Sequence, residues 1–150
     1  MSKKTGVLIV NLGTPDSPST SDVKRYLSEF LNDPRVIDIN PVGRKVLVNG
    51  IIVPTRGPKS AKEYKKLFKI GNGASPLLTY GKNLLKLVRE IGHKQFDVEL
   101  AMRYGNPSMD SVLEKMRLAN YDQLIIFPLY PQYASATTGS IIEKAFKIIS

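Results

Sequence analysis

The chain has 150 residues, 42% of them hydrophobic and 23% charged, a composition typical of one globular domain. It contains no cysteine, which excludes disulfides, zinc fingers, Cys-ligated iron–sulfur clusters and a thiolate nucleophile. Its net charge of +9 favours an anionic partner: nucleic acid, a phosphate or carboxylate ligand, or an acidic membrane surface. We expect a cytoplasmic location, because no run approaches the roughly 18 apolar residues of a spanning helix and the basic opening lacks the apolar length of a signal peptide.

The first third of the chain predicts a strand and then helices. Residues 7–10 form a short apolar run typical of a strand. A capped amphipathic helix follows, with apolar residues at helical spacing: Val23, Tyr26, Leu27, Phe30 and Leu31. Residues 42–53 are unusually apolar and contain only two charges. We expect this segment to be largely exposed, because its apolar residues fit no single helical stripe.

The remainder alternates helices and strands. Residues 59–69 predict a basic helix, and Ser75 and Pro76 begin another that ends at Gly92. The apolar stripe expected on that second helix comprises Leu77, Tyr80, Leu84, Leu87, Val88 and Ile91. Residues 98–102 predict a second strand, and Ser108 begins the helix after it. A third strand spans 124–127, and Thr137 or Thr138 opens a last helix through Ile142, Ala145, Phe146 and Ile149.

This order predicts an α/β fold, a Rossmann-like parallel β-sheet with helices on both faces. Ligands of such open sheets bind at the carboxyl ends of the strands. Three strand ends are therefore expected to meet at one crevice: residues 11–14, 103–104 and 130–135.

Several kinds of enzyme site are absent from the sequence. His93 is the only histidine, no HExxH or P-loop motif occurs, and no residue is a convincing general base. Arg103 stands at a strand end, where a guanidinium requires an anionic ligand or a structural acidic partner. Tyr104, Tyr130 and Tyr133 surround the same edge and are suited either to sheet packing or to a flat apolar ligand.

Four segments resemble conserved motifs of one family, in the family's order over nearly the whole chain. They are residues 7–15 (VLIVNLGTP), residues 56–59 (RGPK) with Tyr64 and residues 71–76, residues 102–107 (MRYGNP), and residues 130–140 (YPQYASATTGS). Together they resemble the N-terminal half of ferrochelatase. The resemblance implies that residues 1–150 form the N-terminal α/β domain of a two-domain, chelatase-like enzyme whose C-terminal domain is absent here.

The resemblance also implies an activity, the insertion of ferrous iron into protoporphyrin IX or coproporphyrin III in haem biosynthesis. Arg56, Tyr64 and Ser75 would hold the porphyrin propionates. The residues that would line the porphyrin pocket are Leu12, Arg103, Tyr104, Tyr130 and Ser135. No catalytic residue, metal ligand or cofactor site is expected in this half, so the chain alone is expected to be inactive.

The expected partners are porphyrin, ferrous iron and the C-terminal half of the same enzyme, but not nucleic acid. Residues 42–53 would form an apolar lip at the mouth of the cleft and contact a membrane peripherally. Two alternatives remain. One is a homodimeric small chelatase that uses His93 as its base, and the other is a non-catalytic anion-binding module.

Overall fold

The structure of the protein is a computed structural model that describes residues 3–92 and 95–149. The chain divides into two compact units. Unit 1 comprises residues 1–13 and 80–150, and unit 2 comprises residues 14–79.

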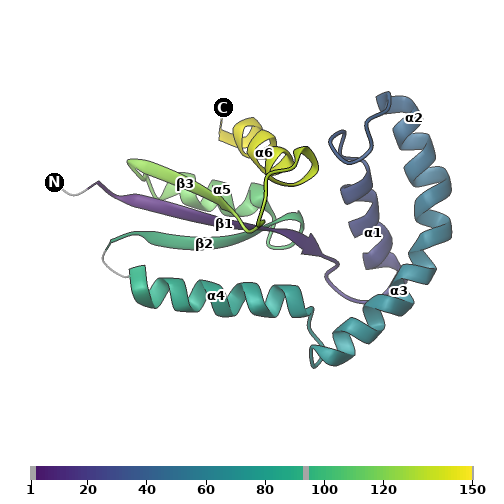
Figure 1. Cartoon of the computed structure of the whole chain (residues 1–150), viewed down its shortest axis with the longest axis horizontal. Helices are drawn as coiled ribbons and strands as arrows, with labels where there is room; N and C mark the ends of the chain where they lie inside the picture. Colours follow the sequence, from purple (N-terminus) through teal and green to yellow (C-terminus); the bar gives the residue numbers. More distant parts are fainter. Residues whose placement is uncertain (1–2, 93–94, 150) are drawn as a thin grey trace. The chain divides into compact units, whose positions relative to one another are not determined.

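Unit 1 is built on a three-stranded sheet in the order β2-β1-β3 (Figure 1). Its strands are β1 (Thr5–Thr14), β2 (Asp97–Gly105) and β3 (Gln123–Pro128). β1 and β3 run parallel, with Val7 opposite Ile125 and Ile9 opposite Phe127. The parallel sheet predicted from the sequence is confirmed, although β1 and β2 extend further than their apolar runs.

Helices cover both faces of this sheet. Helices α5 (Met109–Leu118) and α6 (Ser140–Ile149) pack on the face that carries Leu8 and Val10. On the other face lies α4 (Pro76–Gly92), where Gly81 lets the helix approach Leu100 closely. The prediction that helices lie on both faces is therefore confirmed, although Ile125 and Phe127 on the α4 side stay exposed.

The apolar residues predicted along α4 and α6 are buried only in part: Leu77, Leu84 and Val88 of α4 are half-buried, and Ala145 of α6 is buried. On α6 the core takes Ile141 and Ala145, whereas the predicted Ile142, Phe146 and Ile149 are exposed. Apolar residues lie on α6 to both sides of Ala145 around the helix axis. Their spacing alone therefore does not determine which side packs against the sheet. On α4 the buried residues are Gly81 and Gly92, and three members of the predicted stripe are exposed: Tyr80, Leu87 and Ile91.

Unit 2 is helical. It contains α1 (Thr20–Leu31), α2 (Pro41–Lys45), the π-helical segment η1 (Val46–Ile52) and α3 (Val53–Ile70). The Ser19 side chain caps α1 by accepting a hydrogen bond from the Asp22 backbone N–H at 3.2 Å. Gly57 is buried in α3 because the Lys24 side chain of α1 occupies the space where a Cβ would stand.

The apolar segment 42–53 forms a continuous helical stretch rather than an extended loop. Val48 and Val53 are buried, whereas Val42, Val46 and Ile51 are 73%, 63% and 56% exposed. The expected exposure of this segment is thus confirmed for the side that carries Val42, Val46 and Ile51, and it is wrong for the side that carries Val48 and Val53. Unit 2 needs the second side for its own core.

Candidate functional site

The carboxyl ends of the three strands meet at one edge of unit 1. The Leu129 N–H donates to the Val10 carbonyl at 2.8 Å, which holds the segment after β3 against β1. Gly13 has a φ of +117°, and a Cβ built on it would stand 1.8 Å from the Tyr104 carbonyl oxygen. Only glycine allows the two backbones to approach this closely. The predicted strand ends are therefore neighbours.

Arg103 and Tyr104 belong to a hydrogen-bonded cluster at this edge. The Arg103 Nε–H donates to the Ser140 Oγ at 2.7 Å, and its guanidinium lies over the Tyr104 ring, 4.4 Å from the ring centroid. The Tyr104 hydroxyl lies 3.2 Å from the same Ser140 Oγ. The cluster places a permanent cation beside polar hydroxyls at the end of β2.

Tyr130 contributes a buried hydroxyl that is not hydrogen-bonded. Its ring packs against the core cluster of unit 1, while its hydroxyl oxygen has no hydrogen-bond partner among the described residues. Burial raises the pKa of this hydroxyl, and the positive charge of Arg103 opposes that shift. A buried donor without a partner costs free energy, so this hydroxyl has the chemistry to receive a ligand acceptor.

Leu12 and Ser135 lie on the segments that frame this edge. Leu12 is half-buried near the end of β1, and its backbone N–H donates to the Asn11 Oδ1 at 2.8 Å. Ser135 is exposed at the first position of the π-helical segment η2 (Ser135–Gly139), which leads directly into α6. The expectation that the last helix opens at Thr137 or Thr138 is corrected, because helical geometry begins at Ser135.

The other predicted site residues belong to unit 2. Arg56 is exposed on α3, and no side-chain hydrogen bond or ion pair of it is found within the described ranges. Tyr64 is half-buried, and its ring meets Tyr26 edge-on at 6.1 Å between centroids. Burial raises the pKa of the Tyr64 hydroxyl, while a hydrogen bond with Tyr26 opposes the shift. Ser75 is buried just before α4.

Ser140 is a site residue that sequence reasoning missed. It ends the TTGS portion of a motif noted above, but serine at the start of a helix has the ordinary explanation of local capping. Its contact with Arg103 spans 37 positions of sequence, and spacing within one segment carries no signal for such a contact.

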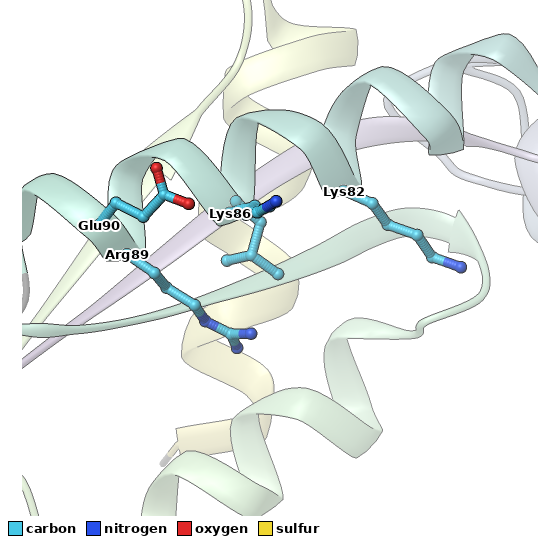
Figure 2. Close-up of a pocket in the computed structure, with 5 residues that line it drawn as sticks. Lys82, Lys86, Arg89 and Glu90 are labelled. Atoms are coloured by element: carbon cyan, nitrogen blue, oxygen red, sulfur yellow. The ribbon is translucent and has the colours of Figure 1, made fainter.

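A groove of about 730 Å³ lies along α4, where Lys82, Lys86, Arg89 and Glu90 are labelled in Figure 2. Arg89 reaches the Val98 carbonyl at 3.1 Å, near the amino end of β2. Arg89 also pairs with the Glu99 carboxylate at 3.1 Å. At its Arg89 end, this groove is therefore distant from the carboxyl edge that carries Arg103.

In residues 3–92 and 95–149, no group of three or more His, Cys, Asp or Glu side chains could hold a metal ion. No helix in those ranges is long and apolar enough to cross a membrane. His93, the base required by the homodimeric alternative, lies outside the described residues.

The fold and the edge residues define a class of protein, an α/β protein with cationic and hydroxyl side chains at the carboxyl ends of a parallel sheet. The family model described as Ferrochelatase matches residues 4–150. The chain belongs to the ferrochelatase family.

Similar proteins agree with this assignment. The chain is 44% identical over 148 residues to a protein named Ferrochelatase from Francisella tularensis subsp. tularensis strain WY96-3418. A protein of the same name from Chromobacterium violaceum is 43% identical over 151 residues. Each match covers 98% of this chain, but only 44% and 41% of the respective relatives. The chain thus spans less than half the length of these relatives.

Proposed function

We propose that this chain is the porphyrin-binding N-terminal half of an enzyme that inserts ferrous iron into a porphyrin. Protoporphyrin IX and coproporphyrin III are the candidate substrates, the pathway is haem biosynthesis, and the location is the cytoplasm. Family membership supports the reaction class, and the relatives carry the name Ferrochelatase. The observation that carries the proposal is the buried Tyr130 hydroxyl beside the cationic Arg103; this hydroxyl has no hydrogen-bond partner within residues 3–92 and 95–149.

The proposed substrate matches the chemistry of the site residues. A porphyrin is a flat apolar ring with carboxylates at its edge. Leu12 and the rings of Tyr104 and Tyr130 supply apolar and aromatic surface, Ser135 supplies a hydroxyl, and Arg103 supplies positive charge. In unit 2, Arg56, Tyr64 and Ser75 supply the donors proposed for the propionates.

The catalytic steps are assigned to the part of the relatives' length that this chain does not match. Iron insertion requires the pyrrole nitrogens to lose protons, hence a general base with a pKa near neutrality. None of the proposed binding residues has this property, since they are arginine, tyrosine, serine and leucine. We assign this half the binding and orientation of porphyrin, with ferrous iron as substrate and no resident cofactor.

A Tyr130→Phe substitution separates ligand binding from stability. It removes the unpaired hydroxyl, so the ligand-free chain is expected to be equally stable or more stable, by up to about 1 kcal/mol. Porphyrin affinity is expected to fall about 2- to 12-fold, the value of one neutral hydrogen bond. Urea unfolding and porphyrin fluorescence titration measure the two quantities. A variant that loses stability and keeps its affinity would show that the hydroxyl serves the fold alone.

The C-terminal half of the same enzyme is the proposed partner for the apolar residues that stay exposed on the α4 side of the sheet. Ile125 and Phe127 of β3 share the α4 side of the sheet with Ile9, yet both are exposed. Leu87 and Ile91 of α4 are exposed as well. Parallel sheets normally have both faces covered, so we propose that the C-terminal half of the same enzyme covers these residues.

The exposed side of residues 42–53 is the proposed membrane contact. Val42, Val46 and Ile51 project apolar surface from the α2–η1 stretch, and Arg44 and Lys45 add positive charge nearby. This combination suits the surface of an anionic membrane.

Changing Val42, Val46 and Ile51 to serine together is expected to weaken binding to phosphatidylglycerol vesicles at least about tenfold. Each fully buried apolar side chain is worth about 1.5–3 kcal/mol, and partial insertion retains part of that value. Leu118→Ser, at an exposed apolar position of α5, is the matched control and is expected to bind like the wild type. Vesicle co-sedimentation measures both, and equal binding by the triple variant and the wild type would eliminate this contact.

A further inference from the structure

One helical stretch of unit 2 carries most of the net charge of the protein. Residues 41–70, in which α2, η1 and α3 follow one another without a break (Figure 1), contain eight of the 22 Lys and Arg residues but only one of the 13 Asp and Glu residues. Their net charge is therefore +7, whereas the other 120 residues together carry +2 of the total of +9. Such a concentration of charge on one element indicates a surface that meets an anionic partner.

Five of these cations are exposed lysines on one side of α3. This lysine face comprises Lys59, Lys62, Lys65, Lys66 and Lys69. At about 100° per residue, the five positions span about 120° of the helix circumference. The side of α3 that packs on α1 lies opposite, where Gly57 meets the Lys24 side chain. Tyr64 meets Tyr26 of α1 there as well. The lysine face is therefore turned away from the core of unit 2.

Acidic side chains leave this face almost uncompensated. Glu63 is the one carboxylate of residues 41–70, and it pairs with Lys66 at 3.0 Å. Within residues 3–92 and 95–149, none of the other four lysines forms an ion pair. Four ammonium groups are thus available to an external anion.

Exposed apolar side chains extend the same side of the helical stretch. Val42, Val46 and Ile51 are exposed on its N-terminal half, and Ile70 is 76% exposed at its C-terminal end. Val48, on the opposite side of η1, is completely buried. A helix with cations and exposed apolar residues on one side is typical of contact with an anionic membrane surface.

Nucleic acid is a second polyanion with the charge to bind such a face. Proteins that bind single strands add aromatic rings on which the bases stack. On α3, however, Tyr64 is half-buried and Phe68 is buried, so neither ring is presented beside the lysines. These observations favour a lipid surface over nucleic acid.

We propose that the lysine face of α3 is an electrostatic docking surface for the anionic headgroups of a membrane. The inference rests on the membrane contact proposed above for residues 42–53, and it adds selectivity for anionic lipid and reversal by salt to that contact. The helical stretch lies along the membrane surface, with its apolar residues in the interface and its lysines among the headgroups.

Binding of the 150-residue chain to vesicles tests the proposal. The wild type is expected to bind vesicles of phosphatidylcholine and phosphatidylglycerol, mixed at about 2:1, at least about tenfold more tightly than phosphatidylcholine alone. Changing Lys62, Lys65 and Lys69 together to glutamine is expected to weaken binding to the mixed vesicles at least about 30-fold, since each lysine near an anionic surface contributes about fivefold. The corresponding triple arginine variant keeps the charge and is expected to bind like the wild type.

The control removes the same charge from unit 1. Changing Lys3, Lys82 and Lys86 to glutamine, all at exposed positions, is expected to weaken vesicle binding less than about threefold, because these lysines lie outside the lysine face. The triple serine variant of Val42, Val46 and Ile51 is expected to bind more weakly but to keep the salt dependence of the wild type. The triple glutamine variant of the lysine face is expected to lose that salt dependence.

The outcomes separate this inference from the proposals beside it. A loss of selectivity for anionic lipid that is confined to the glutamine variant of the lysine face would establish the docking surface. Equal binding by that variant and the wild type, or an equal loss in the unit 1 control, would overturn it and leave the apolar contact in place. Release from the vesicles by polyglutamate or duplex DNA at an equal concentration of charge would overturn the assignment to lipid. Porphyrin affinity, expected to be unchanged in the glutamine variant of the lysine face, tests the proposed function separately.

Discussion

Replacing Gly13 with alanine is expected to lower the free energy of unfolding of unit 1 by at least about 3 kcal/mol. Two effects combine at this position. The φ of +117° is one that residues with a side chain rarely adopt. In addition, the new Cβ would stand 1.8 Å from the Tyr104 carbonyl oxygen, and a backbone atom cannot rotate away. The strand ends that carry Leu12 and Arg103 would have to separate.

Hydrogen exchange read peptide by peptide measures this change, because it reports on β1 and β2 separately from unit 2. Gly73→Ala is the matched control. Gly73 also has a positive φ, of +90°, but no atom lies within 4 Å of its Cβ position. Gly73→Ala is expected to lower the free energy of unfolding only by the cost of backbone strain, about 1–2 kcal/mol. If Gly13→Ala costs no more than Gly73→Ala, the close approach of β1 and β2 is not tightly constrained.

Arg56→Ala is expected to weaken binding of a free-acid porphyrin by about 1.5–3 kcal/mol, the value of a hydrogen bond to a charged group. The Arg56 side chain is exposed on α3, and its removal leaves no buried group unpaired. Stability is therefore expected to change by less than about 0.5 kcal/mol. Titration with a porphyrin and with its propionate ester in parallel measures the effect.

The two ligand forms are the critical comparison for Arg56. A carboxylate partner predicts a large loss for the free acid and little loss for the ester. Lys62→Ala, at another exposed cation on the same helix, is the control for general loss of positive charge. Equal losses for acid and ester, or equal losses in the Arg56 and Lys62 variants, would argue against a propionate contact.

Two helix starts were predictable because their signals are local, whereas α3 begins at Val53 rather than at residue 59 and the last helix begins at Ser135. The sequence predicts a capped helix before Val23 and a helix that begins at Ser108, and the structure shows the Ser19 and Ser108 side chains accepting backbone N–H groups of the following turn. The buried faces of α4 and α6 were not predictable in the same way. Both helices have apolar residues on two flanks, and packing against the sheet selects between them. On α4 the selected side is lined by Gly81 and Gly92, which hydrophobicity alone does not identify.

The candidate site was predictable to the extent that it depends on strand ends. Arg103, Tyr104 and Tyr130 stand directly after or within apolar runs, and parallel strands bring such positions together. Ser140 depends instead on a contact between α6 and β2, far apart in sequence. That the Tyr130 hydroxyl has no hydrogen-bond partner among the described residues likewise depends on three-dimensional packing, which the sequence does not show.

The central claim is that the carboxyl edge of the unit 1 sheet binds the porphyrin. Amide chemical-shift mapping of the 150-residue chain during titration with protoporphyrin IX tests it most directly. The account predicts saturable shifts at Leu12, Arg103, Tyr104 and Tyr130 with the free acid, and the same shifts at higher ligand concentration with the dimethyl ester, which keeps the flat apolar ring but lacks the carboxylates. Shifts confined to the α4 groove of Lys82, Lys86 and Arg89, with none at the carboxyl edge of the sheet, would contradict it.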